Sequence, residues 1–153
     1  MVKIRFKGKT PIIEDLSEEY TIEYLARSPK GVIYLVIWPK DPTKRKGFYE
    51  TFRLFIGKGK DMKEAEILNA MRFRDGGTTY IKFRFEGREC TLHFPAGRLA
   101  RANPDVTCDD SPKKVVELEL FIRSGFLLTK ESEGRSFIES LKEKVGFLKA
   151  FRK

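Results

Sequence analysis

The stretch that decides the fold reads TTYIKFRFEGRECTLHF over residues 78 to 94. Two segments, 78–85 and 88–94, alternate apolar and polar side chains around the dipeptide Glu86-Gly87, which is typical of a two-residue hairpin turn. Such a turn fixes the partners on one face as Arg84 with Glu89, Lys82 with Thr91, and Tyr80 with His93. The other face then carries Ile81, Phe83, Phe85, Leu92, Cys90 and Arg88. The sequence therefore predicts an antiparallel hairpin with a mostly apolar core face and a basic, partly aromatic outer face.

Arginine is concentrated around this hairpin, over residues 71 to 101. Six of the seven cationic side chains there are arginine, whereas the rest of the chain has seven Arg and seventeen Lys. The guanidinium group is planar and binds phosphate through two parallel hydrogen bonds. Aromatic side chains on the same sheet face can stack on bases or sugars. The candidate nucleic-acid ligands here are Arg72, Arg74, Tyr80, Lys82, Arg84, His93, Arg98 and Arg101. The alternative is a solvated sheet whose charge Glu89 and nearby acidic residues neutralise.

Composition indicates one basic, folded domain covering residues 1–153. Thirty-one Lys and Arg against 22 Asp and Glu give a net charge of +9, which favours a polyanionic partner, DNA or RNA. The chain has no Gln and only two Asn, and 35% of its residues are charged, as in proteins of hyperthermophiles. The longest apolar run, Gly31 to Trp38, is too short to span a bilayer. We expect a cytoplasmic protein with no membrane partner, and a homodimer remains open.

The basic loop at residues 39–47, PKDPTKRKG, has two readings. It is a solvated connection, or its side chains Lys44, Arg45 and Lys46 form an arm that contacts phosphates. After it, Asp61 and Glu64 are spaced as in a capping box and predict a helix over residues 61–72. A second amphipathic helix is expected over residues 136–151, where Ser136 and Glu139 form a similar box.

The predicted fold class is α+β. Seven strands are expected, and we take the segment Val32 to Trp38 as central because both of its faces are apolar. The seven strands should form a mainly antiparallel, strongly twisted sheet with helices 61–72 and 136–151 packed on it. A duplicated βββα unit is an open alternative. The expected strands are residues 2–7, 20–28, 32–38, 48–56, 78–85, 88–94 and 114–122. Residues 95–112 are expected to be a long connection, with Arg98 and Arg101 at its start and acidic residues at its end.

Catalytic constellations are few. The sole histidine has no GxSxG partner, and Cys90 and Cys108 belong to no CxxC motif, so no zinc site is expected. Buried or free thiols are favoured for the two cysteines, and a disulfide, which hyperthermophile interiors tolerate, is the alternative. No cofactor is expected. The enzyme alternative is a Mg²⁺-dependent nuclease or phosphodiesterase that uses the carboxylates Asp109, Asp110, Glu117 and Glu119. A third alternative is a protein-interaction module in which Trp38, Tyr34 and Tyr49 form an exposed patch.

One segment resembles a known family. The run VELEL at residues 116–120, ahead of the last expected helix, is similar to the later part of the triphosphate tunnel enzymes over residues 115 to 151. That family opens on a strand with a Glu-x-Glu-x-Lys motif. The first expected strand here, Val2 to Lys7, has no carboxylate, so the resemblance carries no activity over.

Overall fold

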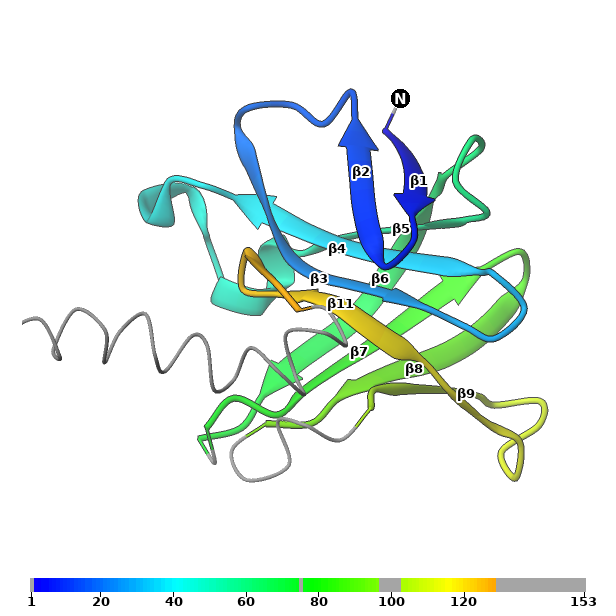
Figure 1. The fold of residues 1–153 in the computed structure, drawn as a ribbon. Helices are drawn as coiled ribbons and strands as arrows, with labels where there is room; N and C mark the ends of the chain where they lie inside the picture. The colour runs from blue at the N-terminus through cyan, green and yellow to red at the C-terminus, as the bar shows by residue number, and fades with distance from the viewer. Residues whose placement is uncertain (1, 75, 97–102, 129–153) are drawn as a thin grey trace, which may run out of the picture.

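The computed structural model describes residues 2–74, 76–96 and 103–128, and these residues form an all-β protein (Figure 1). They contain no α-helix, only the two 3₁₀ turns η1 and η2, and no helix among them could cross a membrane. The elements in chain order are β1 (Lys3–Lys7), β2 (Thr10–Glu14), β3 (Tyr20–Arg27), β4 (Ile33–Pro39), η1 (Pro42–Lys44), η2 (Phe48–Thr51), β5 (Arg53–Gly57), β6 (Lys63–Arg72), β7 (Thr79–Phe85), β8 (Arg88–Phe94), β9 (Asp105–Cys108), β10 (Val115–Glu117), β11 (Glu119–Arg123) and β12 (Phe126–Leu127).

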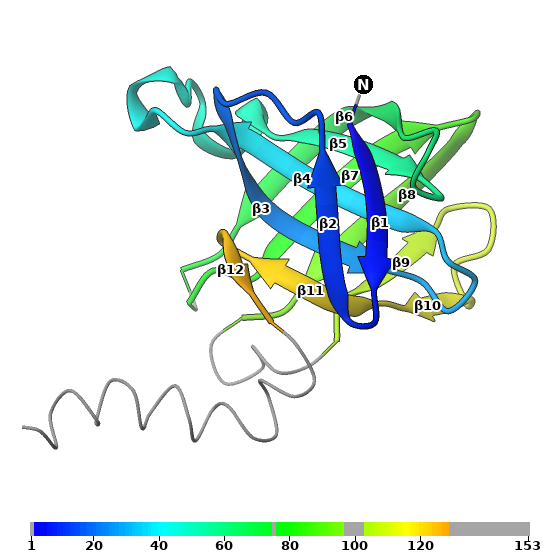
Figure 2. The same cartoon turned by 45° about the horizontal axis from the view of Figure 1, so that its top comes forward.

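Ten of these strands form one antiparallel sheet that curls into a half-barrel, and β1 and β2 form a separate hairpin (Figures 1 and 2). The order of the large sheet is β10-β9-β8-β7-β6-β5-β4-β3-β11-β12. Although β10 and β11 lie at opposite sides of this order, only Leu118 separates them in the chain. The two sides of the sheet must therefore approach each other, and the curl follows from the connectivity.

Two apolar cores stabilise this arrangement. The first lies inside the curl, where Tyr24, Leu54 and Leu92 are at most 2% exposed. The second lies between the outer surface of β3 and β4 and the hairpin β1–β2, which crosses over them in Figure 2. Both faces of β4 are thus covered, which confirms its predicted central position. At Gly59, φ is +118° and a Cβ would clash with the backbone oxygen of Ile4, so glycine lets the hairpin dock closely.

The hairpin over residues 78–94 has the register that its sequence predicts. Tyr80 pairs with His93, and all three predicted pairs of the outer face occur between β7 and β8. Glu86 and Gly87 both have positive φ, 50° and 76°, as a two-residue turn of this hand requires. The local turn and the alternation were sufficient to determine this element.

The predicted α+β class is wrong, and the helix predicted over residues 61–72 is the strand β6. Its alanine, leucine and methionine residues favour a helix, but this preference is weak, and pairing with β5 and β7 overrides it. A register shift between Ile67 and Asn69 also hides the alternation. Ala65 and Ile67 pack inward before the shift, whereas Ala70 does so after it. The strand therefore shows no single period along its length.

Other expectations on the fold also change. The sheet has more strands than the seven predicted, the strand expected over residues 48–56 begins only at Arg53 after η2, and the connection expected over residues 95–112 contains β9. The βββα duplication is wrong because its first helix is a strand. The helix predicted over residues 136–151 lies outside the described residues.

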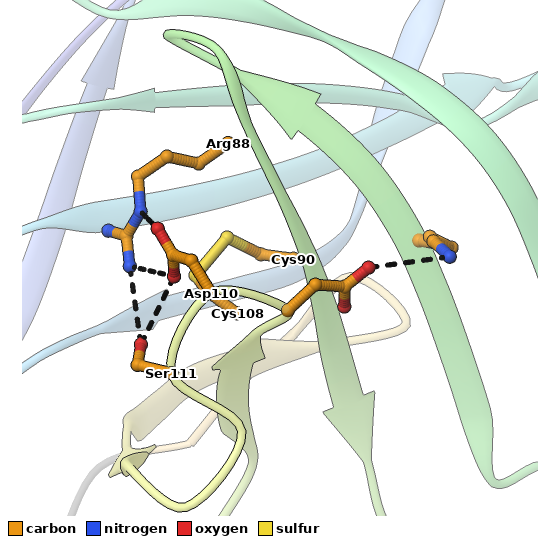
Figure 3. The surroundings of a disulfide bond; sticks show 7 residues. Arg88, Cys90, Cys108, Asp110 and Ser111 are labelled. Atoms are coloured by element: carbon orange, nitrogen blue, oxygen red, sulfur yellow. Dashed lines mark hydrogen bonds and ion pairs between the residues drawn. A yellow bond between two sulfur atoms is a disulfide. The ribbon is translucent and has the colours of Figure 1, made fainter.

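The expectation of buried or free thiols is wrong, because Cys90 and Cys108 form a disulfide (Figure 3). The two residues are direct partners between β8 and β9, with Cα atoms 3.9 Å apart. The next pair along, Asp109 and Glu89, shares a backbone hydrogen bond, so the cysteines occupy a non-hydrogen-bonded position, where facing side chains lie closest. The bridge was the less favoured alternative from the sequence, in which β9 was taken for part of a loop.

Candidate nucleic-acid interface

The outer face of β6, β7 and β8 carries a row of stacked side chains. Met71, Tyr80 and His93 are consecutive cross-strand partners, so they lie side by side on this face. The rings of Tyr80 and His93 stack with centroids 4.6 Å apart, and Phe73 meets Tyr80 edge-on at 5.7 Å. Phe73 is 48% exposed and Met71 47%. We call Phe73, Met71, Tyr80 and His93 the aromatic row, and it offers an apolar platform to solvent.

The charged residues beside the aromatic row are largely paired with one another. Arg84 donates to Glu66 at 2.9 Å and to Glu89 at 3.2 Å, and Lys82 lies within 4 Å of Glu89 and Asp109. These pairs are roughly half exposed, so water and salt screen them. The predicted basic outer face is therefore close to neutral, which is the alternative that its acidic neighbours suggested.

His93 has an acidic partner as well. Its Nδ1 lies 3.0 Å from a carboxylate oxygen of Asp105, the partner residue on β9. A carboxylate in this position fixes the orientation of the imidazole ring. The ring is thereby held in contact with Tyr80, so the row is ordered before any ligand binds.

Arg72 does not belong to this face, because the register shift in β6 directs it into the half-barrel. Its guanidinium donates to Glu23 at 2.8 Å, to the Tyr24 hydroxyl at 3.0 Å and to Thr79 at 2.8 Å. The side chains of Arg72 and Glu23 are only 19% and 4% exposed. Arg72 thus forms a structural ion pair, and it is not one of the nucleic-acid ligands that the sequence predicted.

A second buried arginine lies nearby, and the sequence showed no sign of it. Arg123 donates from Nη2 to the carbonyl oxygen of Pro95, and its buried Nε has no hydrogen-bond partner among the described residues. Burial, with a smaller contribution from the charge of Arg72, lowers the pKa of Arg123. At the end of the half-barrel that holds Arg72, the carboxylate of Glu23 therefore interacts with two arginines.

The cations of the 39–47 loop lie at this same end. Arg45 stacks on the ring of Trp38, 3.8 Å from its centroid, and donates to the carbonyl oxygen of Pro39. Lys44, Lys46 and Arg74 are exposed; the charge of Lys44 acts on Asp41, whereas Lys46 and Arg74 have no carboxylate partner within the described part of the chain. Arg98 and Arg101 lie outside the described residues. Two of the predicted phosphate ligands, Lys46 and Arg74, are thus free of a carboxylate partner among the described residues.

The structure also bears on the two alternatives. Trp38, Tyr34 and Tyr49 pack against the inner core, so they do not form the exposed patch that an interaction module would need. The four carboxylates of the metal alternative each contact a different partner. Over residues 2–74, 76–96 and 103–128, no three His, Cys, Asp or Glu side chains are grouped as metal ligands. Neither alternative gains a site from this geometry.

No protein-family model, curated protein or solved structure matches the chain. Sequence reasoning found Tyr80 and His93 but missed Phe73 and Met71. Once residues 63–72 are known to form a strand, the alternation of Met71 and Phe73 with the inward Arg72 places both side chains on the outer face.

Proposed function

We propose that the protein binds single-stranded nucleic acid, without catalysis, on the outer face of β6 to β8. The aromatic row is the observation that carries the proposal. Stacking on aromatic side chains holds unpaired bases and is worth about 1–3 kcal/mol per base. Bases inside a duplex cannot reach such a platform, so the single-stranded form of DNA or RNA is the ligand.

Phosphate contacts are available beside the row. Arg74 follows Phe73 directly and has no described carboxylate partner, and Lys82 and Arg84 lie two and four residues beyond Tyr80 on the same face of β7. Exposed ion pairs contribute little to stability, so these two cations can exchange their carboxylates for phosphates at small cost. The net charge of +9 adds an attraction that is independent of sequence.

The test is fluorescence anisotropy with labelled oligothymidine, oligouridine and a duplex of mixed sequence, titrated from about 50 to 200 mM salt. Phe73→Ala with Tyr80→Ala should weaken single-strand binding about tenfold or more and leave the salt slope unchanged, because stacking is lost and phosphate contacts remain. Lys82→Ala with Arg84→Ala should instead reduce the salt slope.

The matched control is Phe126→Ala with Leu127→Ala, which removes two exposed apolar side chains at β12, away from the row. Thermal melts must show that each variant is folded. Equal losses in the two apolar double variants, tighter binding of the duplex, or no binding at the lowest salt would each refute the proposal.

A further inference from the structure

The other end of the half-barrel is hollow. The turns β3–β4, β5–β6, β7–β8 and β9–β10 all lie there, at the right of Figure 1. Two cavities of about 380 and 440 Å³ open between them and share Val32, Tyr34, Arg88 and Cys108 as walls. We call this end the mouth. Ligand sites for small organic molecules have volumes of roughly 300–1,000 Å³, so each cavity is large enough for one.

The floor of the mouth is apolar. Ile56 and Phe83 line it with exposures of 4% and 2%, and the disulfide between Cys90 and Cys108 adds two sulfur atoms. At the opposite end, the stacked rings of Tyr24 and Phe94 fill the interior, with centroids 3.8 Å apart. The hollow is therefore confined to the mouth, and an apolar body placed there would leave water.

The rim of the mouth is cationic. Among the described residues that line the two cavities, five are Lys or Arg and two, Asp61 and Glu86, are carboxylates. Arg88 is held in place by Asp110, whose carboxylate oxygens accept from Nε at 2.9 Å and from Nη2 at 2.8 Å (Figure 3). With Arg88 paired in this way, four lysines without a described carboxylate partner stand against Asp61 and Glu86, an excess of two positive charges; these lysines are Lys30, Lys58, Lys63 and Lys114.

Tyr34 stands where the two cavities meet. Its ring packs edge-on against Phe83, and within the described part of the chain its hydroxyl makes no hydrogen bond. Desolvation by burial raises the pKa of Tyr34, although the charge of Arg88 opposes this, so the phenol keeps its proton at neutral pH. A protonated hydroxyl between an apolar floor and a cationic rim can donate to an anionic headgroup.

We infer that the mouth binds a small apolar molecule with one anionic headgroup, of the class of medium-chain carboxylates. The hydrocarbon body lies on the floor, and the headgroup lies between Tyr34 and the lysines Lys58 and Lys63. The site is separate from the aromatic row, so the two activities are independent. A ligand of the mouth needs an anionic group to complement the cationic rim and an apolar body to cover the floor, and neither feature alone is sufficient.

The experiment uses 1-anilinonaphthalene-8-sulfonate as a fluorescent probe and decanoate as the competitor, with decanol and decylamine as uncharged and cationic controls of equal chain length. Decanoate should displace the probe at concentrations at which decanol and decylamine do not. Lys58→Glu with Lys63→Glu should weaken decanoate binding about tenfold or more, because two attractive charges become repulsive.

Lys3→Glu with Lys7→Glu is the matched control, since it changes the net charge equally on β1, outside the mouth. Val32→Phe, which fills the cavity, should abolish binding in a protein that still melts cooperatively. Equal displacement by the three competitors, equal effects of the two charge reversals, or no displaceable probe on the full chain would each overturn the inference. Phe73→Ala with Tyr80→Ala should bind decanoate as the unaltered protein does, so failure here is distinct from failure of the nucleic-acid proposal.

Discussion

The buried pair between Glu23 and Arg72 is the sharpest test of the fold. Glu23→Gln keeps the shape of the side chain but removes the charge that faces the guanidinium 2.8 Å away. Breaking a buried ion pair costs about 3–5 kcal/mol, since the remaining charge is left uncompensated. Arg72 keeps its bonds to Tyr24 and Thr79 and is 19% exposed, so we expect the low end, about 3 kcal/mol. The charge of Arg123 repels that of Arg72, so we do not expect the loss of unfolding free energy in Glu23→Gln to be smaller than this.

For a domain of this length, a loss of that size lowers the melting temperature by about 6–12 °C. The measurement is urea unfolding at constant temperature, supported by calorimetry. Glu64→Gln is the control, because it removes a pair with Arg53 whose side chains are 43% and 39% exposed, and it should cost less than about 1 kcal/mol. Glu23→Leu with Arg72→Met should recover much of the stability, since neither charge of the pair is left without its partner and Arg123 loses the attraction of Glu23 together with the repulsion of Arg72. Similar losses for Glu23→Gln and Glu64→Gln would refute the reasoning.

Three further predictions follow from single contacts. Cys90→Ala with Cys108→Ala, or reduction of the bridge, should lower the free energy of unfolding by about 3 kcal/mol. The cysteines are 18 residues apart, and a bridge that closes such a loop restricts the unfolded chain. Urea unfolding with and without reductant measures the difference. Gly59→Ala should cost about 1–3 kcal/mol and loosen β1, which hydrogen exchange of the β1 amides would reveal; unchanged exchange would contradict the close approach. The hydrogen bond from Arg88 lowers the pKa of Asp110. The pair therefore stabilises the fold at pH values above the ordinary Asp pKa of about 3.9, and this contribution is lost as the pH falls from there through the lowered pKa. An NMR titration should find a higher pKa for Asp110 in Arg88→Ala, because its largest lowering influence is removed.

The candidate interface was predictable only where local rules apply. Tyr80 and His93 could be placed on one face because a two-residue turn sets the register of the whole hairpin. Only part of the neutralisation of that face could be predicted, since Glu66 reaches it from β6 and Asp109 from the residue after β9. Neither strand was expected from the sequence. The mouth was not predicted at all, because four turns far apart in the chain form it.

The sequence by itself determined the 78–94 hairpin and the double-sided burial of β4. In both, the decisive interactions are between neighbours along the chain, namely turn conformation, alternation and a run of apolar side chains. Only the tertiary structure decided that residues 63–72 form a strand, that Arg72 faces inward, and that Cys90 meets Cys108. Each of these depends on hydrogen bonds and burial supplied by strands distant in the chain. Those contributions outweigh the small helix preference that residues 61–72 have on their own.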